Sequence, residues 1–173
     1  MKKNDFYKLE KADKITIFNA IATEKGMTPF AVEKDWWVSH TLNIIFQMNI
    51  DKHLVFKGGT SLSKAWKLIN RFSEDIDLAI DKEYFGFNGD LNKNQRDKLR
   101  KTAGAYTIGT FFEELQEKFR IKGFSELEFK VIEAKDSDQD PRVLEVYYPN
   151  VIKTNTEYLL PRVRSRLKSA VVR

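Results

Sequence analysis

The segment from Phe56 to Ile80, FKGGTSLSKAWKLINRFSEDIDLAI, constrains the fold of this chain more than any other part of it. Its last residues, DIDLAI, alternate aliphatic side chains with Asp75 and Asp77. A period of two predicts a strand whose aliphatic side chains face the core, while the two aspartates share the opposite face. The segment therefore predicts a sheet that presents a pair of carboxylates.

The spacing of these carboxylates suits metal-assisted phosphoryl chemistry. Two residues of strand rise separate Asp75 and Asp77 by about 6.6–6.8 Å. Side chains at that separation can converge on two hard cations, which two-metal sites hold roughly 3.5–4 Å apart. Oxygen ligands suit Mg²⁺, which takes one or two carboxylates together with substrate phosphates. Taken alone, an Asp-x-Asp pattern in a strand more often marks a side that faces solvent. A metal site is therefore predicted only if a neighbouring feature also indicates one.

A glycine turn upstream supplies that feature. The short strand predicted at Leu54–Phe56 ends in Lys57-Gly58-Gly59-Thr60-Ser61, and a helix capped by Thr60 or Ser61 is predicted to follow, to about Ile69. Two glycines let backbone N–H groups approach an anion, and a helix start adds further free N–H groups. The turn is a candidate phosphate cradle, although its spacing is not that of Walker A.

The rest of the chain alternates helical and strand patterns, which predicts an α+β fold with one domain over residues 1–173. We divide it into a helical N-terminal part (1–50), a core (51–163) and a basic tail (164–173). Helices are predicted over 13–25 and 29–47 and, with a break near Gly109, over 91–120. Further strands are predicted over 127–133 and 143–148, and beyond Pro149 the pattern is weak.

Composition narrows the compartment and the partners. The chain has no cysteine, no apolar run long enough to span a bilayer and no apolar signal core, so we expect a soluble cytoplasmic protein with no membrane partner. The net charge of +5 resides in residues 153–173. A basic segment of this kind can contact phosphate, but a solvated or frayed terminus is the favoured interpretation.

The central segment resembles the signature of the AbiEii/AbiGii toxin family, in the nucleotidyltransferase superfamily. Family members carry Phe-Lys-Gly-Gly-Thr-x-Leu followed by Arg-Phe-Ser-Glu-Asp-Ile-Asp-Leu, which this chain matches at 56–62 and 71–78. The stretch 33–38, EKDWWV, also resembles the family's N-terminal helix. The resemblance implies a nucleotidyltransferase-type fold, with a small mixed sheet flanked by helices.

The resemblance also implies an activity and a set of site residues. Members transfer a nucleoside monophosphate from an NTP to an acceptor, in some cases the 3′ end of tRNA. As toxins of toxin–antitoxin or abortive-infection systems they imply an antitoxin partner. Asp75 and Asp77 would be catalytic and would bind Mg²⁺. The residues implied to hold or flank the nucleotide phosphates are Lys57, Gly58, Gly59, Thr60, Ser61, Lys64 and Ser73.

The chain departs from the family after Val163. Members have a third carboxylate on a neighbouring strand, in a pattern like Val-x-Ile-Glu, where this chain reads Arg164-Ser165-Arg166-Leu167-Lys168. Glu145 is a possible substitute, but its alternation with apolar neighbours favours a solvent-facing side chain. Glu128 and Glu133 are weaker candidates.

This departure leaves three functions open. The first is the transferase toxin. The second is a truncated, non-catalytic remnant that binds NTP or RNA, and a truncated or frameshifted gene is the expectation that goes with it. The third is a nuclease or kinase that uses the same two carboxylates.

Overall fold

The computed structural model describes residues 6–66, 68, 75–136, 141–153 and 160–170. Its helices are α1 (Lys11–Lys25), α2 (Pro29–Ile45), α3 (Gly58–Lys64), α4 (Lys93–Tyr106) and α5 (Phe112–Ile121). Its strands are β1 (Leu54–Lys57), β2 (Asp75–Asp81), β3 (Glu128–Ile132), β4 (Arg142–Tyr147) and β5 (Arg162–Ala170). Short helical turns lie at Asp51–His53 and Lys82–Phe85, and a π-helical turn (Thr107–Phe111) joins α4 to α5.

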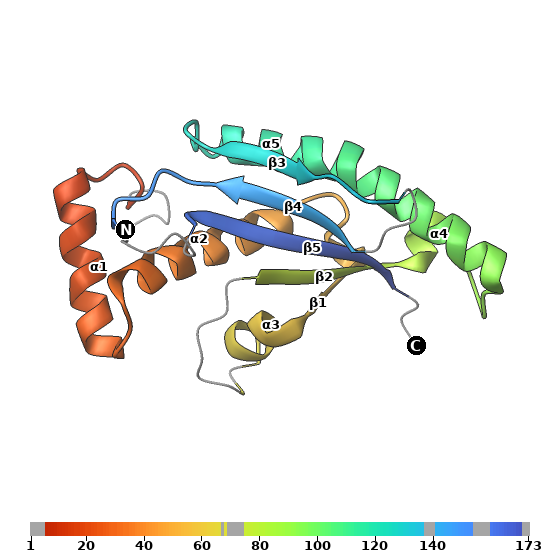
Figure 1. Ribbon diagram of the computed structural model, residues 1–173, viewed down its shortest axis with the longest axis horizontal. Coiled ribbons are helices and arrows are strands. Elements are labelled where there is room, and N and C mark those ends of the chain that lie inside the picture. Colours follow the sequence, from red (N-terminus) through yellow and green to blue (C-terminus); the bar gives the residue numbers. More distant parts are fainter. Residues whose placement is uncertain (1–5, 67, 69–74, 137–140, 154–159, 171–173) are drawn as a thin grey trace.

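The five strands form one sheet in the order β1-β2-β5-β4-β3 (Figure 1). β5 lies at its centre, parallel to β2 and antiparallel to β4. The two outer pairs, β1 with β2 and β3 with β4, are antiparallel. The sheet is therefore mixed, and the predicted α+β fold of nucleotidyltransferase type is confirmed.

Helices cover one face of this sheet. α2 and α5 lie behind the strands in Figure 1, and α1 packs against α2 at the side. The side chains that fill the space between helices and sheet are fully buried, and they include Ile45, Ile76, Leu78, Leu144 and Phe119. The other face of the sheet, which we call the open face, carries most of the strands' charged side chains.

The helix boundaries follow the signals in the sequence. α1 ends at Gly26, which adopts the left-handed conformation with φ +64°. The Thr28 hydroxyl accepts a hydrogen bond from the backbone N–H of Ala31, and Pro29 takes the first helical position of α2. The break predicted near Gly109 is the π-helical turn between α4 and α5.

β5 corrects the interpretation of the basic segment. The sequence favoured a solvated or frayed end, but residues 162–170 form the central strand of the sheet. Val163, Ser165 and Leu167 are buried on the covered face, so the intervening basic side chains project onto the open face. The positive charge of this segment therefore lies beside the aspartates of β2.

Candidate functional site

Asp75 and Asp77 lie on the open face of β2, as the alternation predicts. Their side chains are 33% and 29% exposed, so each is partly shielded from water. In the parallel ladder with β5, Arg164 is the register partner of Asp75 and Arg166 that of Asp77. Register partners in a sheet project from the same face, so each aspartate has an arginine as its neighbour.

The guanidinium of Arg166 binds both aspartates. Its Nε donates to Oδ1 of Asp77 at 2.7 Å, and one Nη lies 3.0 Å from Oδ2 of Asp75 and 3.4 Å from Oδ2 of Asp77. A planar guanidinium has several donors in a rigid fork, which allows one side chain to pair with two carboxylates at once. The guanidinium of β5 thus bridges the two aspartates that the sequence predicts to be a pair.

The glycine turn is in direct contact with this group. Gly58 has φ +75°, and a Cβ at this position would overlap the carboxylate of Asp77. The hydroxyl of Ser61 donates to the Gly58 carbonyl at 3.0 Å, and the hydroxyl of Thr60 donates to the backbone carbonyl of Asp75. Both the conformation and the close approach require glycine. These contacts fix the turn against β2.

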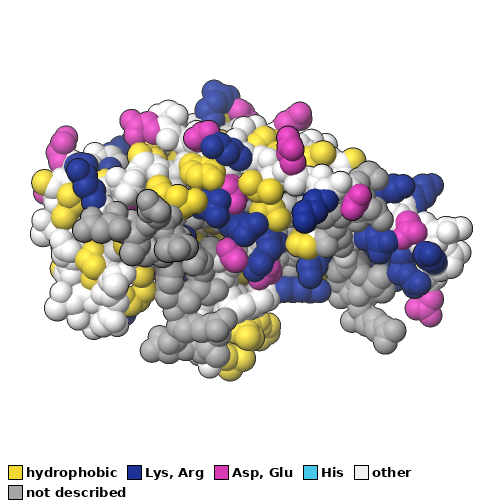
Figure 2. Space-filling model, in the orientation of Figure 1, with side chains coloured by type: hydrophobic (Ala, Val, Ile, Leu, Met, Phe, Trp, Pro, Cys, Tyr) yellow, Lys and Arg dark blue, Asp and Glu magenta, His cyan; other side chains and the backbone are white. Residues whose placement is uncertain are grey.

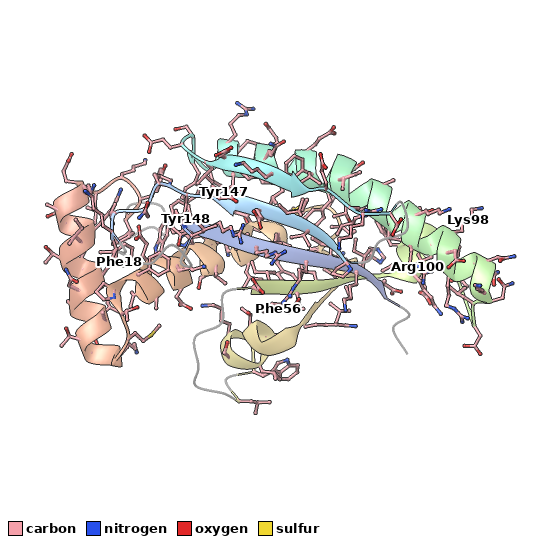
Figure 3. The ribbon with its side chains drawn as sticks, in the orientation of Figure 1. Phe18, Phe56, Lys98, Arg100, Tyr147 and Tyr148 are labelled. Atoms are coloured by element: carbon pink, nitrogen blue, oxygen red, sulfur yellow. The ribbon has the colours of Figure 1, made fainter. Side chains whose placement is uncertain are left out.

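A pocket of about 460 Å³ lies at this junction. Its lining consists of Lys57, Gly58, Asp77, Leu78, Pro141, Arg166 and Lys168. In Figure 2, Lys and Arg side chains gather with a few acidic ones over the strands of the open face, and Figure 3 draws the side chains that project from these strands. Three cationic side chains against one carboxylate make the pocket suitable for an anion.

The remaining residues predicted for nucleotide binding have other surroundings. Gly59, Thr60 and Ser61 lie within α3 and do not line the pocket, and the hydroxyls of the last two bond to backbone. Nζ of Lys64 lies 2.6 Å from Oδ1 of Asp35 and 2.9 Å from the Ser39 hydroxyl, so it is directed at α2. Ser73 lies outside the described residues.

The structure adds two cationic pocket residues that the sequence did not propose, Arg166 and Lys168. Their signal was the alternation of basic and small or apolar residues along 162–168, which is a strand pattern. The family pattern Val-x-Ile-Glu, begun at Val163, would put its glutamate at position 166. Arg166 therefore stands where the third carboxylate is expected, beside Asp77 in the parallel ladder.

Glu145 is not the solvent-facing residue that we expected. It is only 1% exposed, because Arg162 and Arg164 of β5 lie over it at 2.7 and 3.7 Å from its Oε1. The Tyr147 hydroxyl donates to its other oxygen at 2.8 Å. Glu145 also lies two strands away from β2, roughly 9–10 Å across the sheet. It is therefore held by its own arginines and does not complete the aspartate pair.

The donor set does not match a three-carboxylate metal site. Across the described ranges, no three His, Cys, Asp or Glu side chains are grouped so that they could hold a metal ion. Asp75 and Asp77 remain the only acids of the predicted site in those ranges, and both pair with Arg166. A divalent ion does not fit this arrangement of side chains.

Residues 33–38, EKDWWV, have a structural role. The carboxylate of Glu33 is buried in α2 and accepts hydrogen bonds from the backbone N–H groups of Val151 at 2.7 Å and Ile152 at 3.0 Å. Burial raises the pKa of Glu33, and the two hydrogen bonds oppose that shift. Trp37 is buried and stacks on Tyr148. This stretch ties α2 to the chain that follows β4.

A mixed sheet with two carboxylates on its open face, beside a glycine turn, has the architecture of a nucleotidyltransferase. Residues 42–167 match the family model described as "Nucleotidyl transferase AbiEii toxin, Type IV TA system", and the chain belongs to this family. Membership implies a nucleotide substrate and an antitoxin partner, and nucleotidyltransferases generally use a divalent metal. No curated protein and no solved structure matches the chain. None of the helices in the described ranges has the length and apolar character to cross a membrane.

Proposed function

We propose that this protein binds a nucleoside triphosphate in the pocket beside Gly58 and transfers its nucleotidyl group to an acceptor hydroxyl, with the 3′ end of tRNA as the predicted acceptor. The observation that carries the proposal is the lining of that pocket: Lys57, Arg166 and Lys168 surround one carboxylate, Asp77. The volume, about 460 Å³, lies in the range of small-molecule sites.

The three cations account for binding of the triphosphate. Arginine and lysine form short, charge-assisted hydrogen bonds to phosphate oxygens, and the arginine fork can engage two oxygens together. Lys57 comes from β1, whereas the other two come from β5, so the cations approach the pocket from both sides of β2. This arrangement supports a ligand that carries several negative charges.

The reaction is an in-line displacement. The acceptor oxygen forms a bond to the α-phosphorus, and the bond from that phosphorus to the oxygen bridging to the β-phosphate breaks. Pyrophosphate leaves with the bonding electrons, and Asp77 is the carboxylate on the pocket wall that takes the hydroxyl proton. Neutralisation of the leaving group by Lys57, Arg166 and Lys168 supplies most of the rate.

The Mg²⁺ expected at Asp75 and Asp77 has no part in this proposal. Because both carboxylates pair with the Arg166 guanidinium, we assign no step of the reaction to a metal ion. The same observation favours a second function, binding of NTP or RNA without transfer. These two functions make different predictions for a single assay.

The assay incubates each α-labelled NTP with the protein and total tRNA. Label in the tRNA, with release of pyrophosphate, is expected, and Asp77→Ala should abolish both. Asp81→Asn is the matched control, because Asp81 shares the strand and face of Asp77 but does not line the pocket. Bound nucleotide without label in tRNA would support the binding function instead. Release of ADP would indicate a kinase, and shortened RNA a nuclease.

A further inference from the structure

The position of Arg166 has a consequence for how the charge of a bound nucleotide is balanced. We infer that its guanidinium takes the place of a divalent cation at Asp75 and Asp77, so that this chain excludes the metal ion and binds the triphosphate without one. The inference rests on the proposed nucleotide binding for its second part, and on the geometry of the described residues for its first.

The first argument is occupancy. The guanidinium makes contacts of 2.7 and 3.0 Å with one oxygen of each aspartate, and it has a further contact of 3.4 Å with the second oxygen of Asp77. A cation that bridged Asp75 and Asp77 would have to bind Asp77 through an oxygen that already contacts Arg166. It would therefore have to displace Arg166 and then remain beside its positive charge.

The second argument is rigidity. Arg166 belongs to the central strand, and its backbone is paired to Asp77 of β2 on one side and to Val143 of β4 on the other. Its neighbours along the chain, Ser165 and Leu167, are buried in the covered face. The arginine cannot leave the site by a loop movement, because only its side chain is free to turn.

The third argument is charge. With a glutamate at position 166 the site would hold three carboxylates, which favour a divalent ion because each one lacks a counter-charge. With Arg166 the two aspartates and one guanidinium leave a single negative charge. Lys57 and Lys168 then make the pocket as a whole positive, so the triphosphate meets fixed cations where it would otherwise need a metal.

The test measures metal binding directly. The full chain and its Arg166→Glu variant are titrated with Mn²⁺, and free Mn²⁺ is followed by its EPR signal. We expect the variant to bind Mn²⁺ about tenfold more tightly than the wild type, or better, as changes around metal ligands commonly alter affinity about 10–100-fold. Lys101→Glu is the matched control, because it makes the same charge change at an exposed position on α4 that does not line the pocket. It should change the affinity less than threefold, a bound of about 0.65 kcal/mol.

Equal Mn²⁺ affinity in the wild type and in Arg166→Glu would overturn the inference, as would tight wild-type binding that Asp77→Asn removes. Because three clustered carboxylates could unfold the variant, Arg166→Gln is measured as well. It frees both aspartates without adding charge and should bind Mn²⁺ more tightly than the wild type. Thermal unfolding with and without Mn²⁺ gives a second readout, since only a protein that binds the ion is stabilised by it.

Nucleotide binding separates this inference from the function on which it rests. ATP affinity of the wild type is measured in EDTA and in excess Mg²⁺, and the two values are expected to agree within about twofold, which is less than 0.5 kcal/mol. ATP binding that requires Mg²⁺ would overturn metal-free binding. If ATP binds under neither condition, the proposed function fails, and the Mn²⁺ titration then decides the role of Arg166.

Discussion

The two faces of the sheet are built from the same strands but hold together in different ways. The covered face buries Ile76, Leu78 and Leu144 against the helices, where shape and apolar area matter. The open face is held by ion pairs, in which Asp77 and Glu145 are matched to arginines of β5. The comparison shows that β5 contributes to both faces. Its apolar residues pack in the covered face, and its arginines set the charge of the open face.

The largest expected effect tests the covered face. Leu78→Ala removes a side chain that is 1% exposed and should lower the free energy of unfolding by about 3 kcal/mol, because it leaves a cavity. Urea denaturation measures the change. The control, Leu62→Ala, removes the same atoms from a 40% exposed position on α3, and it should cost under about 1 kcal/mol. Equal losses would show that burial does not distinguish the two sites.

A smaller loss is expected from the open face, at Glu145. Glu145→Gln keeps the shape of the side chain but leaves Arg162 and Arg164 without their shared counter-charge, which should cost about 2 kcal/mol. Chemical denaturation of Glu128→Gln is the comparison, because that carboxylate is 64% exposed beside Lys130 and should cost under about 0.5 kcal/mol. A Glu145 variant as stable as the wild type would mean that the ion pairs of Glu145 do not stabilise the fold.

Comparison of Gly58→Ala with Gly89→Ala separates the effect of backbone strain from the effect of the contact with Asp77. Alanine in the left-handed region should cost about 1–2 kcal/mol of stability. Gly89→Ala has the same cost, since Gly89 has φ +63°, but no atom lies near its added Cβ. Only Gly58→Ala should weaken ATP binding, because only there does the methyl group overlap Asp77. Equal effects of the two variants on ATP affinity, measured by calorimetry, would contradict a role for the close approach.

The smallest effect has the opposite sign. The hydroxyl of Ser165 is buried on the covered face, and within the described part of the chain it has no hydrogen-bond partner. Ser165→Ala should therefore raise the free energy of unfolding by about 1 kcal/mol, because a buried hydroxyl without a partner is costly. A rise in the midpoint of urea denaturation measures this gain. A loss of stability would indicate that the hydroxyl is satisfied in solution.

Much of the fold could be predicted from local signals. Gly26 gave the end of α1, Thr28 and Pro29 gave the start of α2, and the alternation in β2 gave the correct face for Asp75 and Asp77. These elements were predictable because each carries its signal within a few residues. The pairing of strands is a property of distant segments, which a single pattern does not contain.

The missed strand explains the other errors. Ser165 interrupts the apolar side of β5, and its basic residues are typical of a solvated end, so the alternation there was not interpreted as a strand. Without β5, Glu145 had no partner and was expected to face solvent. For the same reason, Arg166 was seen only as the absence of a carboxylate. Without β5, the pairing of the acidic side chains with arginines could not be predicted.

The central position of β5 also bears on how the molecule folds. The pair β1–β2 and the pair β3–β4 share no ladder in the described sheet, and β5, last in sequence among these strands, joins them. The contacts that create the pocket therefore span long stretches of chain, which predicts slow folding for a protein of this size. Until that insertion occurs, a partly folded chain holds its two aspartates apart from the arginine, and it has no anion site to offer a nucleotide.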